Sequence, residues 1–92
     1  MDVMSSGYGY TKDLPPTVWL RAIGEQYGVM YYEDINGDCR RAGLRETFCL
    51  YDEFGRPEPS AWQWLRRWGV ESVAFQRDGF VQFVSVEAMV QP

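Results

Sequence analysis

The dipeptide Asp78-Gly79 lies between two apolar segments, and it constrains the fold of this chain more than any other feature. Aspartate followed by glycine tolerates the positive φ angles that a two-residue hairpin turn requires. The flanking segments, 72–77 and 80–86, are rich in valine and phenylalanine, which favour strands. The sequence therefore predicts an antiparallel hairpin over residues 72–86, and with it a sheet.

Residues 16–27 have the spacing of a short helix. Trp19, Ile23 and Tyr27 recur at every fourth position, which places them on one face of a helix. Prolines, which are tolerated in a first helical turn, precede them, and Gly28 follows where a left-handed cap is favoured. We therefore expect a helix over residues 16–27.

A second helix is expected over residues 60–68. Ser60 and Gln63 have the spacing of a capping box, in which each side chain bonds the other residue's backbone amide. Gly69 follows the segment and is suited to end the helix.

The middle of the chain predicts two further strands. Residues 29–35 are rich in strand formers and end at Asn36-Gly37, a favoured hairpin turn. Residues 38–43 are polar, whereas residues 47–51 again favour a strand. Each half then has a proline-led helix, a capping glycine and a hairpin turn, a pattern consistent with an α-β-β unit that occurs twice. The expected class is α+β, with two short helices packed on a four- to five-stranded, mainly antiparallel sheet.

The chain has the size and composition of one compact domain. It has 92 residues, of which 46% are hydrophobic. Residues 1–13 lack periodicity and are expected to be a flexible N-terminal arm, followed by a single domain over 14–92. The sequence has no apolar run long enough to cross a membrane and no signal-peptide pattern, so a cytoplasmic location is expected. Unpaired Cys39 and Cys49 are the simplest interpretation, with a disulfide between them as the alternative.

Catalytic chemistry has little support in the residue inventory. The chain has no histidine, which removes the most common proton-transfer residue and every Ser/His or Cys/His pair. Cys39 beside Arg40-Arg41 is the one candidate nucleophile, and a plain cysteine beside solvated arginines is the favoured interpretation. Asp34, Asn36 and Asp38 match the start of a calcium loop, but its glycine and final glutamate are missing. We expect no enzyme activity, no cofactor and no metal.

Aromatic and arginine residues are the candidates for partner binding. Three of the four tryptophans lie within residues 62–68, and one helix face cannot bury all three. One interpretation places Trp64, Leu65 and Trp68 in the core and leaves Trp62 half-covered by a loop. In the other, Trp62 is an exposed anchor. Consecutive residues of a strand point to opposite faces of the sheet, so one of these two tyrosines, Tyr31 or Tyr32, should face away from the helices. The candidate partner-binding residues are Trp62, Arg66, Arg67, Tyr31 and Tyr32.

These features favour a small non-catalytic protein-binding module, an inhibitor or accessory protein that docks on a larger protein or ribonucleoprotein assembly. Its size, acidity and lack of catalytic chemistry resemble the profile of phage or mobile-element inhibitors of host defence machinery, anti-CRISPR proteins among them. The expected sheet is apolar on both faces, which suggests a surface for self-association in a homodimer or for another partner. The alternative is that the arm over residues 1–13 covers this surface.

Nucleic-acid binding is the alternative function. The formal net charge of −4 argues against it unless the charges are segregated by face. A surface free of carboxylates would favour nucleic acid. Interleaving of Glu33, Asp34, Glu46 or Glu71 with the arginines would favour a protein partner. The arginines that would have to share that surface are Arg40, Arg41, Arg45, Arg66 and Arg67.

Overall fold

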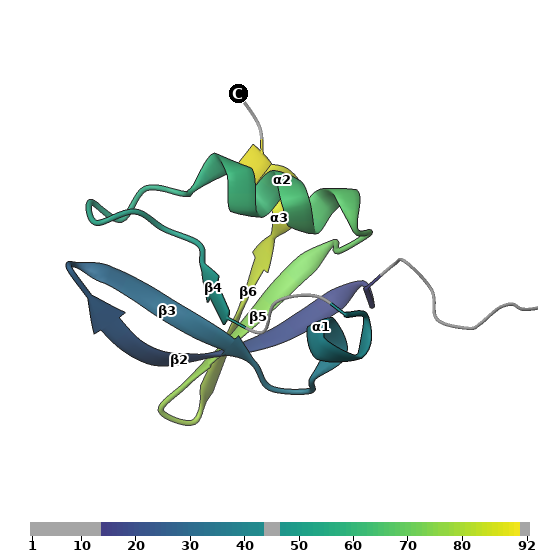
Figure 1. Ribbon diagram of the computed structural model, residues 1–92, viewed down its shortest axis with the longest axis horizontal. Coiled ribbons are helices and arrows are strands. Elements are labelled where there is room, and N and C mark those ends of the chain that lie inside the picture. The colour runs from purple at the N-terminus through teal and green to yellow at the C-terminus, as the bar shows by residue number, and fades with distance from the viewer. Residues whose placement is uncertain (1–13, 44–46, 91–92) are drawn as a thin grey trace, which may run out of the picture.

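The computed structural model describes residues 14–43 and 47–90, which form five strands and three short helices (Figure 1). The expected arm over residues 1–13 lies outside the described residues. None of the described helices has the length and apolarity needed to cross a bilayer. In chain order the elements are β2 (Thr17–Gln26), β3 (Val29–Asp34), α1 (Asp38–Arg41), β4 (Thr47–Cys49), α2 (Pro59–Arg67), β5 (Ser72–Arg77), β6 (Phe80–Ser85) and α3 (Val86–Val90).

The strands form one mixed sheet in the order β4-β3-β2-β5-β6. The central pair, β2 and β5, is parallel, and the other three pairs are antiparallel. Figure 1 shows α2 lying across one face of this sheet. The predicted α+β class with a mainly antiparallel five-stranded sheet is confirmed, although the described residues form three helices rather than two.

The helix predicted over residues 16–27 is wrong, because this segment is β2, a central strand of the sheet. Its inward positions are every second residue: Val18 and Leu20 are fully buried. Threonine, valine and isoleucine in the segment favour strands, and the contacts with two neighbouring strands outweigh the four-residue spacing of the aromatic side chains. The repeated α-β-β unit is wrong with it, since the first half begins with a strand.

The hairpin turn predicted at Asn36-Gly37 is also wrong. The turn that joins β2 to β3 is Tyr27-Gly28, whose φ angles of 54° and 81° suit a two-residue hairpin. Gly37 instead precedes α1, with a φ of 73°. The chain turns there because the Asp34 carboxylate accepts a hydrogen bond of 2.6 Å from the Cys39 amide. The strand predicted over residues 47–51 is found as β4, which ends at Cys49 and pairs with β3 on its other side.

The C-terminal hairpin is confirmed. β5 pairs antiparallel with β6 around Asp78-Gly79, whose φ angles are 50° and 81°. The second strand ends at Ser85, one residue earlier than expected. Val86, which is buried, begins α3, a helix that the sequence did not indicate.

The second predicted helix is confirmed as α2, but its first residue differs. Pro59 occupies the first helical turn and Glu58 precedes it, so the helix begins before the expected cap at Ser60. The Ser60 hydroxyl donates to the Glu58 carboxylate at 3.2 Å, and no side chain caps the helix. The expected capping box is therefore wrong. Gly69, with a φ of 85°, follows the last turn as predicted.

Trp62 is the centre of the core between α2 and the sheet. Its side chain has 0% of its surface exposed, and its indole Nε1 donates a hydrogen bond of 2.8 Å to the Leu50 carbonyl oxygen. Trp64 and Trp68 are only half-buried at the edge of this core. The expectation of an exposed or half-covered Trp62 is wrong, because the polypeptide from β4 to α2 folds over the ring and supplies its hydrogen-bond partner. The buried residues around it include Val18, Leu20, Phe48, Leu50, Leu65, Val70, Val73 and Val86.

We predict that Trp62→Ala lowers the free energy of unfolding by ~3–5 kcal/mol, because it opens a large cavity in the core. It also removes one of the two hydrogen bonds that the Leu50 carbonyl accepts, the other being from the Glu58 amide. Urea denaturation followed by circular dichroism measures the change. Gln63→Ala, one position along the same helix and exposed, is the control and should stay within ~0.5 kcal/mol of the parent. Equal losses in the two variants would contradict the placement of Trp62.

Candidate partner-binding site

An open groove lies on the same sheet face as α2, beyond the part that the helix covers. Side chains of alternate residues share a face, so Val73, which lies under α2, shares its face with Phe75 and Arg77 farther along β5. The register pairs Phe75 with Gln82 and Arg77 with Phe80, which brings β6 into the same surface. The groove has a volume of about 610 Å³ and is lined by Ala22, Met30, Tyr32, Tyr51, Phe75, Gln76, Arg77, Asp78, Phe80, Val81 and Gln82.

Aromatic rings form the floor of the groove. The Phe75 ring centroid lies 5.0 Å from that of Tyr32 and 6.3 Å from that of Tyr51. Tyr51 in turn meets the buried Trp62 ring edge-on at 5.9 Å. Burial raises the pKa of both tyrosines, so their hydroxyls stay protonated at neutral pH and can donate as well as accept hydrogen bonds. The floor is therefore apolar, with two neutral polar groups.

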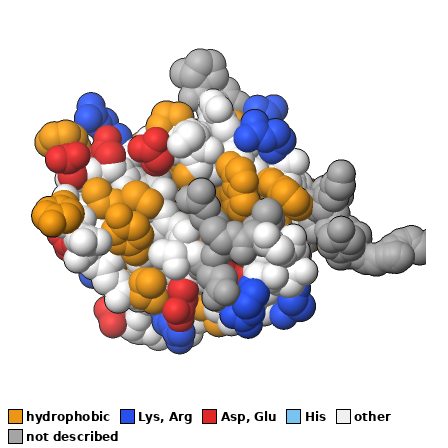
Figure 2. All heavy atoms as spheres, in the orientation of Figure 1, with side chains coloured by type: hydrophobic (Ala, Val, Ile, Leu, Met, Phe, Trp, Pro, Cys, Tyr) orange, Lys and Arg blue, Asp and Glu red, His pale blue; other side chains and the backbone are white. Residues whose placement is uncertain are grey.

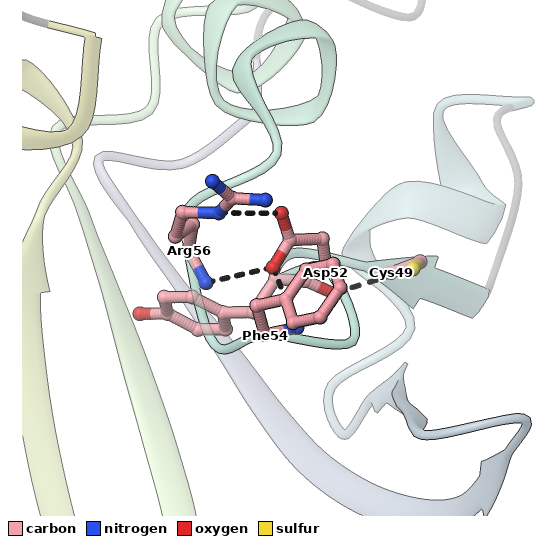
Figure 3. A network of polar contacts seen from close by, with 5 residues as sticks. Cys49, Asp52, Phe54 and Arg56 are labelled. Atoms are coloured by element: carbon pink, nitrogen blue, oxygen red, sulfur yellow. Dashed lines mark hydrogen bonds and ion pairs between the residues drawn. The ribbon is translucent and has the colours of Figure 1, made fainter.

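Tyr51 comes from a turn that a polar network holds in shape (Figure 3). The Asp52 carboxylate accepts hydrogen bonds of 2.9 Å from the amides of Phe54 and Arg56 and pairs with the Arg56 guanidinium at 3.2 Å. These bonds, the one from the Arg56 amide foremost, lower the pKa of Asp52. The Arg56 guanidinium also lies 5.0 Å from the Phe54 ring centroid. Because the turn is tied at both ends, the position of Tyr51 is fixed before any partner binds.

Exposed side chains of the β5–β6 hairpin form the outer wall of the groove. Phe80 is 79% exposed, the second largest exposed fraction among the large hydrophobic side chains of the described residues. The Arg77 guanidinium lies 3.8 Å from the carboxylate of Asp78, and both side chains are exposed. The positive charge of Arg77 also lowers the pKa of Tyr32, although burial outweighs it. The wall thus offers an aromatic ring and a cation to a partner, the side-chain types that dominate binding hot spots.

The structure separates the residues that the sequence singles out. Tyr32 lies in the groove, whereas Tyr31 is half-buried on the opposite face of the sheet, where it pairs with Cys49. Arg66 and Arg67 are exposed on α2, away from the residues that line the groove. The prediction that Trp62 contacts a partner is wrong, because none of its surface is accessible. The prediction that consecutive tyrosines divide between the two faces is confirmed.

The other residues that build the groove do not stand out in the sequence: Met30, Tyr51, Phe75, Arg77 and Phe80. One signal was available for two of them. In a two-residue hairpin the residues that flank the turn are paired and share a face, so Arg77 and Phe80 could have been placed together. Tyr51 has no local signal, because its place depends on how the turn packs against β5.

Comparison with known proteins adds no family to this description. No protein-family model, curated protein or solved structure matches the chain.

Cys39, the candidate nucleophile, is a fully buried side chain of the core. Burial, together with the nearby Asp34 carboxylate, raises the pKa of its thiol to about 12. A thiol in this environment is protonated at neutral pH and is not accessible to a substrate. Neither Cys39 nor Cys49 forms a disulfide, as the simplest interpretation of the sequence predicts.

The acidic residues at the end of β3 and the start of α1 form hydrogen bonds and an ion pair with neighbouring residues. Asp34 accepts a hydrogen bond from the Cys39 amide, and Asp38 pairs with Arg41 at 2.6 Å. In residues 14–43 and 47–90, no group of three histidine, cysteine or acidic side chains is placed to hold a metal ion. The part of the calcium-loop pattern that the sequence contains thus stabilises α1.

We predict that Cys49 of the folded protein reacts with a thiol reagent at pH 8 and that Cys39 does not. Cys49 is partly exposed, while Cys39 is buried and its pKa of about 12 leaves almost no thiolate. The raised pKa also means that the contribution of the Cys39 thiol to stability is complete below its ordinary pKa of 9.0 and is lost as the pH rises towards about 12.

The control is Cys49→Ser, whose single remaining thiol should react only after urea is added. Equal rates for the two cysteines in the folded protein would place Cys39 at the surface.

Proposed function

We propose that this chain is a non-catalytic protein-binding module that takes an apolar segment of a larger protein into the aromatic groove. The groove is the observation that carries the proposal. It is concave, its floor is built from rings held by the core and by the Asp52 turn, and exposed Phe80 and Arg77 form its wall. Surfaces of this kind bind through a few aromatic and arginine side chains around an apolar centre.

The distribution of charge favours a protein partner over nucleic acid. Arg41 pairs with Asp38 at 2.6 Å, and Arg66 lies 3.4 Å from Glu87. Two of the arginines that would contact phosphates thus lie beside carboxylates, Asp38 and Glu87, which weaken the attraction of a phosphate backbone and support a protein partner. Figure 2 shows the arginine side chains of the visible face at several separate places rather than in one patch. Arg45, the fifth arginine of the alternative, lies outside the described residues.

The narrower expectation, an inhibitor of host defence machinery of the anti-CRISPR type, stays a prediction. It depends on the identity of the partner. The groove supports a docking function in general and is equally compatible with an accessory subunit.

We predict that Phe80→Ala and Arg77→Ala each weaken partner binding about thirtyfold, equivalent to ~2 kcal/mol. Both side chains are exposed and line the groove, so the melting temperature should be nearly unchanged. The partner is first recovered with the immobilised full-length chain, and its affinity is then measured by titration calorimetry with each variant.

Phe54→Ala is the matched control, since Phe54 is also an exposed aromatic residue (72%) but lies outside the groove. The control should bind like the parent. Loss of affinity in the Phe54 variant alone would move the binding site to the turn. Unchanged affinity in both groove variants would contradict the proposal.

A further inference from the structure

The strand β6 forms an outer edge of the sheet, with β5 on one side and no described strand on the other. Natural proteins protect such edges with charged residues, prolines or very short strands, because unpaired backbone groups invite pairing with another chain. The opposite edge, β4, has only three residues. In contrast, β6 has six residues, Phe80–Ser85, and none of them is charged or proline.

The hairpin geometry shows which backbone groups of β6 point outward. A two-residue turn is closed by a hydrogen-bonded pair, here Arg77 and Phe80, and hydrogen-bonded and non-hydrogen-bonded pairs alternate along an antiparallel ladder. The amides and carbonyls of Phe80 and Gln82 therefore point towards β5. Those of Val81 and Phe83 point away from it and are placed to bond another strand.

Exposed apolar side chains gather on the same strand. The described residues expose six large hydrophobic side chains, and three of these, Phe80, Val81 and Phe83, belong to β6. Val81 is 43% exposed and Phe83 is 60% exposed, and strand alternation directs both side chains to the sheet face opposite the groove. Val81 lies at the rim and also lines the groove with part of its surface. There Phe83 meets Trp19 edge-on, with 5.7 Å between the ring centroids. Pairing along this edge would cover apolar surface as well as satisfy backbone groups.

We propose that β6 pairs antiparallel with β6 of a second copy of this chain, with Gln82 on the two-fold axis. In this register Val81 lies opposite Phe83 of the second copy, and the second copy repeats the contact. Phe80 lies opposite Val84 on the other face. The outward backbone groups of Val81 and Phe83 then bond each other across the axis, and the two sheets join into one of ten strands, twice the five strands of each copy.

The strand is self-complementary in this register, which is why a second copy fits better than an unrelated peptide. The Val81–Phe83 and Phe80–Val84 pairs, each of which occurs twice, join apolar side chains to apolar side chains. Gln82 lies opposite Gln82 of the second copy, and its amide can both donate and accept a hydrogen bond. Moving the axis to Phe83 would place Val81 opposite Ser85. A strand without charge has no means to select a charged partner, whereas a two-fold interface requires only that the strand match itself.

The pairing can be tested separately from the binding of a groove partner, although Phe80 belongs to both surfaces. α3, which follows β6 directly, packs against α2 and therefore turns inward from the edge. Arg77 lies on β5, one strand away from the pairing edge, so Arg77→Ala should weaken the binding of a groove partner without changing the oligomeric state.

The register is tested with a disulfide on the two-fold axis. Opposite residues of a non-hydrogen-bonded pair have Cα atoms about 4.5 Å apart, within the range that a disulfide spans. We expect Gln82→Cys, made in a Cys49→Ser background, to form a covalent dimer under mild oxidation. Phe80→Cys is the matched control: it lies on the same strand and face, but its equivalent in the second copy is four residues away along the paired strand. The control should cross-link at least about tenfold more slowly.

Opposite charges introduced at paired positions test the same register without a covalent bond. The parent chain should sediment as a dimer whose fraction rises with concentration. Val81→Lys and Phe83→Glu should each be monomeric, because each places a charge opposite an apolar side chain. An equimolar mixture of the two variants should dimerise, since the introduced lysine lies opposite the introduced glutamate. Melting curves of the single variants show whether each is folded.

Three results would overturn the proposal. A parent chain that stays monomeric at every concentration would leave the edge to a different partner, such as an extended peptide. A dimer that both charged variants retain would be built on another surface. Equal cross-linking of Gln82→Cys and Phe80→Cys would exclude the register, and this test holds even if Phe83→Glu fails to fold through loss of its contact with Trp19.

Discussion

The hydrogen bond from the Trp62 indole to the Leu50 carbonyl fixes where α2 lies, and the rest of the structure depends on that position. The ring fills the space between the helix and the sheet, so the helix covers the end of the face that carries Val18 and Val73. The segment that accepts the bond leads into the Asp52 turn and returns to α2. One buried residue thus determines which part of the sheet is covered, where Tyr51 lies, and which part of the face remains open as the groove.

The elements that the sequence predicts correctly are those with a local cause. Asp78-Gly79 can adopt the two positive φ angles of a hairpin turn in almost any context, and Gly69 can end a helix without help from the rest of the chain. Residues 16–27 are different, because Trp19, Ile23 and Tyr27 fit a helical spacing while Val18, Leu20 and Ala22 fit the alternation of a strand. Only the pairing of β2 with strands on both sides decides between them, and that pairing is long-range.

The candidate site was less predictable than the fold for the same reason. The division of Tyr31 and Tyr32 between two faces follows from strand geometry alone, and it is correct. The burial of Trp62 could not be predicted from the helix sequence alone. A helix of nine residues does not show which of its sides packs against the sheet. The groove itself joins β2, β3, β5, β6 and the Asp52 turn, and no spacing in the sequence indicates that these segments meet.

The composition of β6 is informative because its residues serve two separate surfaces. Phe80 and Gln82 line the groove, so an apolar or neutral character at these positions is accounted for by the groove. Phe83 faces the opposite side of the sheet, and Val81 does so with part of its surface. A lysine at either position would protect the edge from pairing at little cost to the groove floor, and it is the device that natural edge strands commonly use. The groove accounts for part of the apolar surface of Val81, and the Trp19 contact accounts for part of that of Phe83. Pairing with a second copy accounts for the apolar surface that both side chains still expose.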